Sequence, residues 1–338
     1  MKKNIYIIYY TWASTKNNHA GMSYFVNQLK LQSEHDIQLI EPPSLITSLI
    51  KKHYYASRIW QQIIAFYLKL MLRKNDSVMF MEYLGGWRCG GHSNIARLLK
   101  KWNIKNHRIG MVHLAKNHIL ESYTEENMVL DLEHLNSILV MGSSLEKDIA
   151  SLGFNNVVRT YHYVDTNYYH PLVVPQKNNK LTVIAMGTLK RNHTLIFKIA
   201  KNCPNIDFLV CAGRSTIDSL TEANVTVLGY MEESEMLSAM QKSDISLSIM
   251  EDTIGSNVIA TSLACGLINV VSDVGSIHDY CSLENSVFCL NENDFIKALN
   301  TLAKDKNIAL KKEHARNKAL QISLDKSIQW YDDFFKNL

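Results

Sequence analysis

Two patterns of apolar residues alternate along this chain. Short apolar runs, such as residues 4–10, 77–81 and 181–186, predict buried strands. Between them, apolar residues recur every three or four positions, which predicts amphipathic helices. Strands that alternate with helices are typical of parallel sheets joined by crossover helices. The pattern therefore predicts an α/β fold with doubly wound sheets.

The predicted elements run the length of the sequence. The expected strands are residues 4–10, 36–40, 77–81, 108–113, 136–141, 157–163, 181–186, 206–212, 225–228, 245–249, 268–272 and 287–290. The expected helices are residues 22–31, 45–72, 92–102, 143–152, 193–200, 232–242, 257–265, 295–304 and 313–338. No short-period repeat appears, so a solenoid is excluded.

Residues 245–276 form the clearest single unit. A strand is followed by a polar turn, a helical run at 257–265, Gly266 at the position of a C-cap glycine, and a second strand. This is a parallel crossover. The helix start, with Ser256 and Asn257 as expected caps, presents free N–H groups and the positive end of the helix dipole. It suits a phosphate or another anion, and an ordinary capped helix is the alternative interpretation.

The chain length of 338 residues predicts two domains. Residues 171–180 contain two prolines and a polar KNNK run, which makes them the best linker candidate. We expect one domain at residues 1–170, a linker at 171–180 and a second domain at 181–320, followed by a final helical segment at 321–338.

Composition narrows the class of protein. The net charge of +4 does not indicate a nucleic-acid partner. The six cysteines are scattered without a CxxC pair, which disfavours a zinc site and favours buried thiols in a reducing compartment. No apolar run reaches the length of a membrane-spanning helix, and the apolar start of the chain fits a first strand better than a signal peptide. We expect a cytoplasmic protein.

Residues 50–74 combine cations with aromatic and aliphatic residues. Arg58, Lys69, Arg73 and Lys74 lie among side chains such as Trp60. Such a segment can lie on an anionic membrane, and we expect contact with the inner face of the membrane. The alternative is a helix pair that covers a sheet with a solvated lysine face.

Candidate ligand residues follow two expected strands of the first half. Glu82, Gly85, Gly86 and Trp87 form a glycine-rich loop after the strand at 77–81. In open α/β sheets, ligands bind beyond the carboxyl ends of the strands. His113 stands at the end of the strand at 108–113, and His118 follows closely. A structural histidine is the alternative for each.

Five motifs follow one another over residues 138–280. They are a strand that ends in serine at 138–144, Val164-Asp165 followed by Tyr169 and Pro171, Met186-Gly187-Thr188-Leu189, Gly229 before a helix and Ser243-Asp244, and Ala264-Cys265-Gly266 before 270–275. Their order and spacing together are more specific than any one of them. With these motifs the sequence resembles the retaining GT-B glycosyltransferases of family 4, and the resemblance covers nearly the whole chain.

The resemblance implies a fold and an activity. The fold would be two Rossmann-like domains facing a cleft, with the C-terminal helix at 321–338 packed back on the first domain. The activity would be transfer of a sugar from a nucleoside diphosphate sugar, of UDP or GDP type, to a glycan or lipid-linked acceptor with retention of configuration. Bacterial surface polysaccharide synthesis, including lipopolysaccharide, is the implied pathway. No metal and no further cofactor is implied.

The resemblance also implies roles for particular residues. The implied catalytic group is His113, Lys190, Arg191 and Glu251. The implied donor-binding residues are Gly21, Gly187, Lys190, Arg191, Gly213, Tyr230, Asp252, Thr253, Gly255, Ser256, Asn257, Val258 and Thr261. The implied acceptor side is Glu82, Gly85, Gly86, Trp87 and His118. Lys190 and Arg191 would offset the charge that develops on the leaving diphosphate.

One departure from the family concerns acidic residues. The family has two glutamates eight positions apart, and counting back from Gly266 places them at Thr253 and Thr261. Glu251 or Asp252 would supply the first carboxylate from a shifted register, and Thr261 would be a weaker, uncharged partner for a ribose. The departure keeps a second hypothesis open, a non-catalytic GT-B protein that binds a glycan or a partner transferase. A sugar-nucleotide epimerase fits the motifs less well.

Overall fold

The computed structural model describes residues 2–11, 16, 18–43, 49, 53–84, 91–172, 180–187, 191–211, 213 and 221–338. Lys190 and the loop residues Gly85, Gly86 and Trp87 lie outside this part of the chain, as does most of the predicted linker at 171–180. The chain forms two compact units. The first consists of Met1–Tyr161 and Asp325–Leu338, and the second of His162–Leu324.

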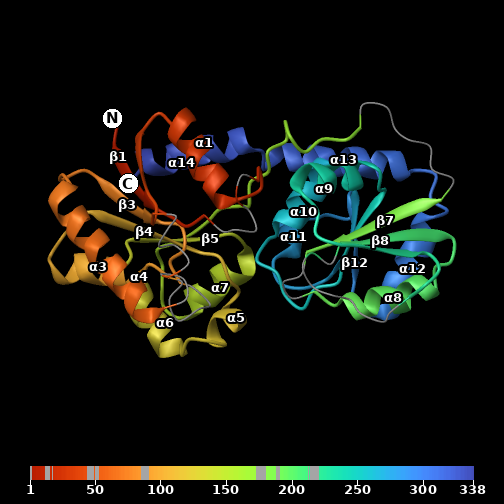
Figure 1. Ribbon diagram of the computed structural model, residues 1–338, viewed down its shortest axis with the longest axis horizontal. Coiled ribbons are helices and arrows are strands. Elements are labelled where there is room, and N and C mark those ends of the chain that lie inside the picture. Colours follow the sequence, from red (N-terminus) through yellow and green to blue (C-terminus); the bar gives the residue numbers. More distant parts are fainter. Residues whose placement is uncertain are drawn as a thin grey trace. The chain divides into compact units, whose positions relative to one another are not determined.

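The first unit is built on a six-stranded parallel sheet in the order β2-β1-β3-β4-β5-β6 (Figure 1). The strands are β1 (Asn4–Ile8), β2 (Asp36–Ile40), β3 (Ser77–Phe80), β4 (His107–Val112), β5 (Ser137–Val140) and β6 (Val157–Arg159). Strands β3 and β5 are buried at every position. This continuous burial is expected of a parallel sheet covered by helices on both faces.

The helices of the first unit are α1 (Met22–Gln32), α3 (Tyr54–Met71), α4 (Ser93–Lys101), α5 (Lys116–Leu120), α6 (Glu125–Leu132), α7 (Ser143–Ser151) and α14 (Leu324–Lys336). Helices α5 and α6 do not appear among the predicted elements. Both are short, and α6 has the sequence EENMVLDL, in which only Met128 and Leu132 are buried. Two buried positions are too few to give a clear helical period.

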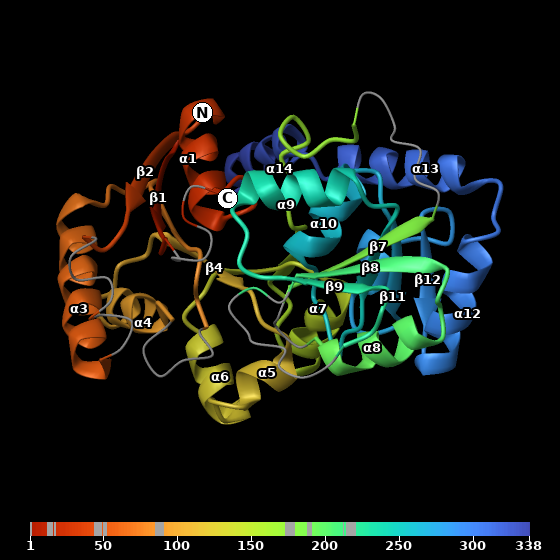
Figure 2. The ribbon, with the colours of Figure 1, turned by 45° about the vertical axis from the view of Figure 1, so that its right-hand side comes forward.

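The second unit has its own six-stranded parallel sheet, in the order β12-β11-β10-β7-β8-β9 (Figure 2). Its strands are β7 (Leu181–Met186), β8 (Ile206–Cys211), β9 (Val225–Leu228), β10 (Ile245–Ser248), β11 (Ile268–Ser272) and β12 (Ser286–Cys289). Its helices are α8 (His193–Lys201), α9 (Glu233–Gln241), α10 (Asn257–Ala264), α11 (Ile277–Tyr280), α12 (Glu292–Leu302) and α13 (Ile308–Gln321).

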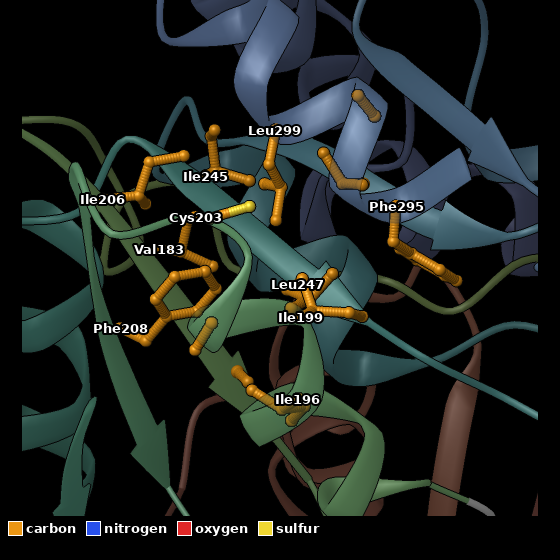
Figure 3. Close-up of a cluster of buried hydrophobic side chains, with 14 of the residues drawn as sticks. Val183, Ile196, Ile199, Cys203, Ile206, Phe208, Ile245, Leu247, Phe295 and Leu299 are labelled. Carbon is orange, nitrogen blue, oxygen red and sulfur yellow. The ribbon is translucent and has the colours of Figure 1, made fainter. Parts of the chain in front are cut away.

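Strands β7, β8 and β10 pack against α8 and α12 in the core of the second unit. Val183, Phe208 and Leu247 meet Ile199 of α8 and Leu299 of α12, and all five are at most 1% exposed (Figure 3). Cys203 lies in the same cluster. The five cysteines within the described residues are free and buried, as the sequence predicts. Burial raises the pKa of Cys211 and Cys265 to about 12, so these thiols stay protonated at neutral pH.

The end of the chain differs from the single helix predicted at 313–338. The structure has two helices, α13 and α14, which are separated at Ile322 and Ser323. Val164 pairs with Ser323 in an isolated parallel bridge. Its N–H donates to the Ile322 carbonyl at 3.0 Å, and its carbonyl accepts from the Leu324 N–H at 2.9 Å. These contacts are all made by Val164, far away in the sequence, so no local pattern indicates the break.

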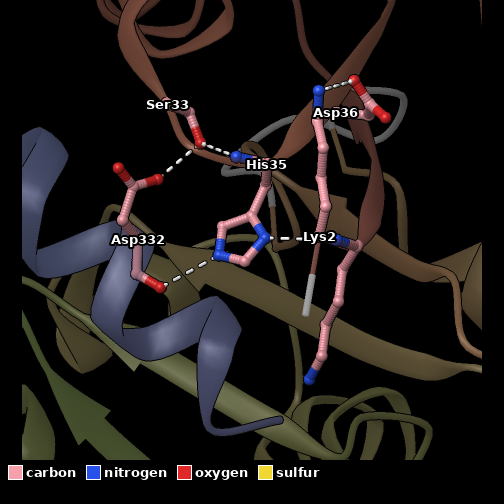
Figure 4. Close-up of polar contacts among 6 residues, drawn as sticks. Lys2, Ser33, His35, Asp36 and Asp332 are labelled. Carbon is pink, nitrogen blue, oxygen red and sulfur yellow. Dashed lines mark hydrogen bonds and ion pairs between the residues drawn. The ribbon is translucent and has the colours of Figure 1, made fainter.

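Helix α14 is held to the first unit by a small polar network (Figure 4). Ser33 Oγ donates to the Asp332 carboxylate at 2.5 Å, and the Glu34 N–H donates to the same carboxylate at 3.2 Å. His35 Nε2 lies 3.2 Å from the Asp332 carbonyl oxygen. Beside these contacts, Tyr331 and Phe335 are 2% and 0% exposed. The last helix therefore completes both the core and the polar surface of the first unit.

Candidate functional site

The candidate site lies at the carboxyl ends of β7 and β10. These two strands are neighbours, and the strand order runs outward from them in opposite directions, through β8 and β9 on one side and β11 and β12 on the other. Such a switch in strand order is where open α/β sheets bind ligands. Gly187 and Arg191 follow β7, and the turn at 251–256 follows β10. Both segments belong to the donor residues implied by the sequence.

Arg191 is fixed in place by contacts with both strand ends. Its backbone pairs with Met250 in an isolated antiparallel bridge. Its Nε donates to the Met186 carbonyl at 3.0 Å, and a terminal nitrogen donates to Ser256 Oγ at 3.3 Å. Burial lowers the pKa of its guanidinium to about 10, which leaves it charged at neutral pH. The result is a preorganised cation at the switch point.

Gly187 allows this guanidinium to lie close to the backbone. Its φ is +83°, and a Cβ there would lie 3.2 Å from both Arg191 Nε and a methyl of Val258. A side chain at Gly187 would therefore strain the backbone and press on the cation. Three of the predicted donor residues, Gly187, Arg191 and Val258, are thus brought together by the fold.

The N-terminus of α10 lies at this site, next to Arg191. Ser256 occupies the N-cap position, but its side chain makes no cap hydrogen bond and instead accepts from Arg191. The first turn of α10 holds no acidic residue. The first N–H groups of a helix have no partner within the helix, and they carry a partial positive charge. Together with Arg191 they can stabilise an anion such as a phosphate.

The side chain of Tyr280 packs against Gly255 in the turn before α10. Gly255 has a φ of +115°, and a Cβ at this position would overlap the phenol of Tyr280. Tyr280 is fully buried, and its hydroxyl accepts from the His162 N–H at 2.9 Å. Sequence reasoning assigned no role to Tyr280 or His162. Nothing in the local pattern indicates one, because the contact joins segments far apart in the chain.

Thr253 and Thr261, at the positions of the family's glutamates, are buried and internally bonded. Thr253 Oγ1 accepts from the Gly255 N–H at 3.1 Å, and the Thr253 N–H donates to Asp252 Oδ1 at 2.7 Å. Thr261 Oγ1 donates to the Asn257 carbonyl at 2.8 Å. Thr253 therefore shapes the turn. The Thr261 hydroxyl uses its one proton within α10 and can offer a ligand only an acceptor.

The other predicted site residues of the second unit, catalytic Glu251 among them, are more dispersed. Glu251 is exposed at the start of the turn. Gly213, with a φ of +64°, follows β8, and Tyr230, which is 51% exposed, follows β9. Both lie beyond carboxyl ends of strands in the same sheet. Their roles, like that of Glu251, remain predictions.

The first unit has an equivalent switch point, between β1 and β3. Glu82 follows β3, and its carbonyl accepts from the His92 N–H at 2.9 Å. Gly21 is the N-cap residue of α1, with an extended backbone at φ −85°. His113 follows β4, and its Nε2 is buried without a hydrogen-bond partner in the described part of the chain. His118 lies on α5, 3.8 Å from the Glu121 carboxylate.

His92 is a buried polar residue that sequence reasoning did not single out. It is fully buried beside the first unit's switch point and stacks on Tyr10 with ring centroids 4.6 Å apart. Burial lowers the pKa of its imidazole to about 3, so the ring is neutral. A separate cavity of about 560 Å³ lies between α3, α4 and α6, and its lining includes Arg58, Arg97 and Asp131. None of the predicted acceptor residues within the described part of the chain lines this cavity.

The chain was compared with protein families, curated sequences and solved structures. Residues 180–305, which contain the switch-point site, match the family model described as glycosyl transferases group 1. A search of curated protein sequences gave no match. Several similar solved structures cover at least 99% of the chain.

A glycosyltransferase from Rickettsia africae is 13% identical with a TM-score of 0.73, over 99% of this chain and 98% of the other. Sucrose-phosphate synthase from Thermosynechococcus elongatus is 10% identical with a TM-score of 0.77, over 99% of both chains. Anabaena HepE, solved in complex with UDP and glucose, is 11% identical with a TM-score of 0.69, over 100% of both chains.

The chain has the GT-B fold. Two parallel α/β sheets, each with a switch in strand order, are what the sequence predicted for this fold. At these identities the likeness shows the GT-B fold alone, and the family match adds support for a glycosyltransferase over residues 180–305. In this GT-B chain the family match includes both Arg191 and the start of α10.

Proposed function

We propose that this GT-B protein transfers a sugar from a nucleoside diphosphate sugar to a hydroxyl acceptor. The observation that carries the proposal is the meeting of Arg191 with the uncapped N-terminus of α10 at Ser256. A nucleoside diphosphate leaving group gains negative charge as its bond to the sugar breaks. Fixed positive groups stabilise the transition state, in which this charge develops, more than they stabilise the bound substrate.

The chemistry assigned to the chain is electrostatic. Arg191 donates to phosphate oxygens, and backbone N–H groups at the start of α10 do the same. Lys190, by its place in sequence, adds a second cation next to Arg191. The acceptor hydroxyl attacks the carbon from which the diphosphate leaves, on the same face, and a phosphate oxygen takes its proton. Retention of configuration and a metal-independent reaction are part of this proposal.

The acceptor is a glycan or a lipid-linked glycan in bacterial surface polysaccharide synthesis, and the donor base is uracil or guanine. The roles given to His113, Glu82 and His118 in the first unit rest on the resemblance described above. The neighbour solved with UDP and glucose supports a nucleotide-sugar donor.

A non-catalytic GT-B protein is the second candidate function. Thr253 and Thr261 favour it, because neither supplies a carboxylate and both hydroxyls are engaged within the turn and α10. Such a protein would bind a glycan or a partner transferase without releasing a nucleoside diphosphate.

A panel of UDP- and GDP-sugars distinguishes the two functions. Slow donor hydrolysis, followed as release of nucleoside diphosphate, is expected from the wild type with at least one donor. Arg191→Ala should remove this release, whereas Lys198→Ala, an exposed lysine on α8, should not. If no donor is hydrolysed or transferred, and a glycan binds, the transferase proposal is wrong and the second candidate stands.

A further inference from the structure

Helix α3 of the first unit has its polar and apolar faces partly exchanged. Ser57 and Gln61 point inward and are 1% and 3% exposed. Tyr55 and Leu70 point outward and are 79% and 68% exposed. A helix that covers a sheet in water normally has the opposite arrangement. Figure 2 shows α3 at the periphery of the first unit, with α4 on its inner side.

The exposed apolar residues form one continuous stripe. Its members recur every three or four positions and are Tyr55, Ile59, Ile63, Phe66 and Leu70. Each is at least 55% exposed. The helix of 18 residues is about 27 Å long, so the stripe runs along most of it. An apolar surface of this extent marks an interaction site, because scattered single residues are the norm on free surfaces.

The charged residues of α3 and of the segment that follows it to Lys74 are all positive. No Asp or Glu occurs from Tyr54 to Lys74. The exposed cations near its C-terminal end are Lys69, Arg73, Lys74, Lys101 and Lys105. Lys101 is the last residue of α4, and Lys105 follows that helix. The end of α4 lies beside α3, as the distance of 5.2 Å between the Lys69 ammonium and the centre of the Trp102 ring shows. An apolar stripe flanked by cations complements a partner that has an apolar interior and a negatively charged outer layer.

We propose that α3 lies in the interfacial layer of a bilayer that contains anionic lipids, with the apolar stripe in the acyl region and the cations at the headgroups. In the described part of the chain no helix is long and apolar enough to cross a membrane, so α3 would lie on the surface. A second copy of the chain is a poorer occupant. A symmetric α3–α3 contact would bring Arg58 and Lys69 of both copies together with no carboxylate on the helix to pair with them.

The test uses the full chain with vesicles and no nucleotide sugar, so that its outcome is independent of the proposed transferase activity. Phosphatidylcholine vesicles with about one third phosphatidylglycerol are compared with pure phosphatidylcholine by co-sedimentation. We expect binding to the anionic vesicles that weakens with salt. Ile59→Ser with Phe66→Ser and Leu70→Ser should weaken binding at least about tenfold, since each buried methylene contributes roughly fourfold in partitioning.

A matched control replaces exposed leucines elsewhere. Leu31→Ser with Leu283→Ser and Leu290→Ser removes three side chains that are each at least 76% exposed and lie outside α3, and binding should be unchanged. Far-UV circular dichroism confirms that both triple variants are folded. The proposal is overturned if the wild type does not bind anionic vesicles, or if both triple variants bind equally well. It is also overturned if sedimentation shows a wild-type dimer that the α3 variant dissociates and vesicles do not bind.

Discussion

Gly255→Ala tests whether Tyr280 supports the turn that leads to the α10 N-terminus. The substitution adds one methyl group at a residue whose φ is +115°, where a Cβ would overlap the buried phenol of Tyr280. That phenol cannot move freely, because its hydroxyl also accepts from the His162 N–H. Relief of the overlap would therefore displace the turn and the start of α10 with it.

The magnitude follows from two contributions. A non-glycine residue in a sparsely populated backbone region costs about 1–3 kcal/mol. An extra carbon in a well-packed interior costs about 1–3 kcal/mol more. We therefore expect Gly255→Ala to lower the free energy of unfolding of the second unit by roughly 2–6 kcal/mol.

Two glycines of the same unit separate these contributions. Gly266 has a φ of +72°, and its Cβ would meet Pro171 Cγ at 3.3 Å, so Gly266→Ala should show mainly the backbone cost of about 1–2 kcal/mol. Gly229 has no positive φ and no atom within 4 Å of its Cβ, so Gly229→Ala should change stability by less than about 0.5 kcal/mol.

Urea unfolding followed by far-UV circular dichroism measures all three variants. Tryptophan fluorescence serves as the internal reference, because every tryptophan belongs to the first unit, namely Trp12, Trp60, Trp87, Trp102 and Trp330. The fluorescence transition should not move in any variant. If Gly255→Ala is no more destabilising than Gly266→Ala, the overlap with Tyr280 does not exist and the reasoning is refuted.

Three further outcomes are expected. Arg191→Ala should weaken UDP or GDP binding roughly ten- to hundredfold by calorimetry, since a charge-assisted hydrogen bond contributes about 1.5–3 kcal/mol, while Lys198→Ala should bind as the wild type does. The folded-state pKa of His92 is about 3, below its ordinary 6.5, so the unfolded chain takes up this proton first. The free energy of unfolding of the first unit should therefore fall by about 1.4 kcal/mol per pH unit as the pH falls from 6.5 toward 3. His92→Gln should make the midpoint of the fluorescence transition depend less on pH, whereas His53→Gln, at an exposed position, should leave that dependence unchanged. Asp332→Ala should lower the unfolding free energy of the first unit by about 1–3 kcal/mol, and an unchanged fluorescence midpoint would contradict the network around α14.

Much of the fold was predictable because burial in parallel sheets is continuous. Strands β7 and β11, most of whose residues are buried, were predicted with the bounds that the structure shows. Gly266, with a φ of +72°, ends α10 as the sequence indicated. The failures have physical causes. Helices α5 and α6 bury too few residues to show a period, and the break between α13 and α14 is imposed by Val164, far away in the sequence.

The candidate site was predictable in part for the same reason. Arg191, Gly187 and the 251–257 turn follow strands, and the order of parallel strands brings strand ends together. Their detailed bonding was not predictable. Ser256 was expected to cap α10 with its side chain, but its hydroxyl bonds to Arg191 instead. Tyr280 reaches Gly255 only through the tertiary fold, and that contact has no counterpart in the local sequence.

The place of α14 in the first unit has a consequence for synthesis of the chain. The first unit combines Met1–Tyr161 with Asp325–Leu338, which the ribosome makes only after the whole second unit. Tyr331 and Phe335 fill its core, so a nascent chain exposes the matching apolar surface until residues 325–338 have been made. The second unit, which is continuous in sequence, can fold before the first one closes. A nascent chain stalled before residue 325 would therefore be a natural client for chaperones.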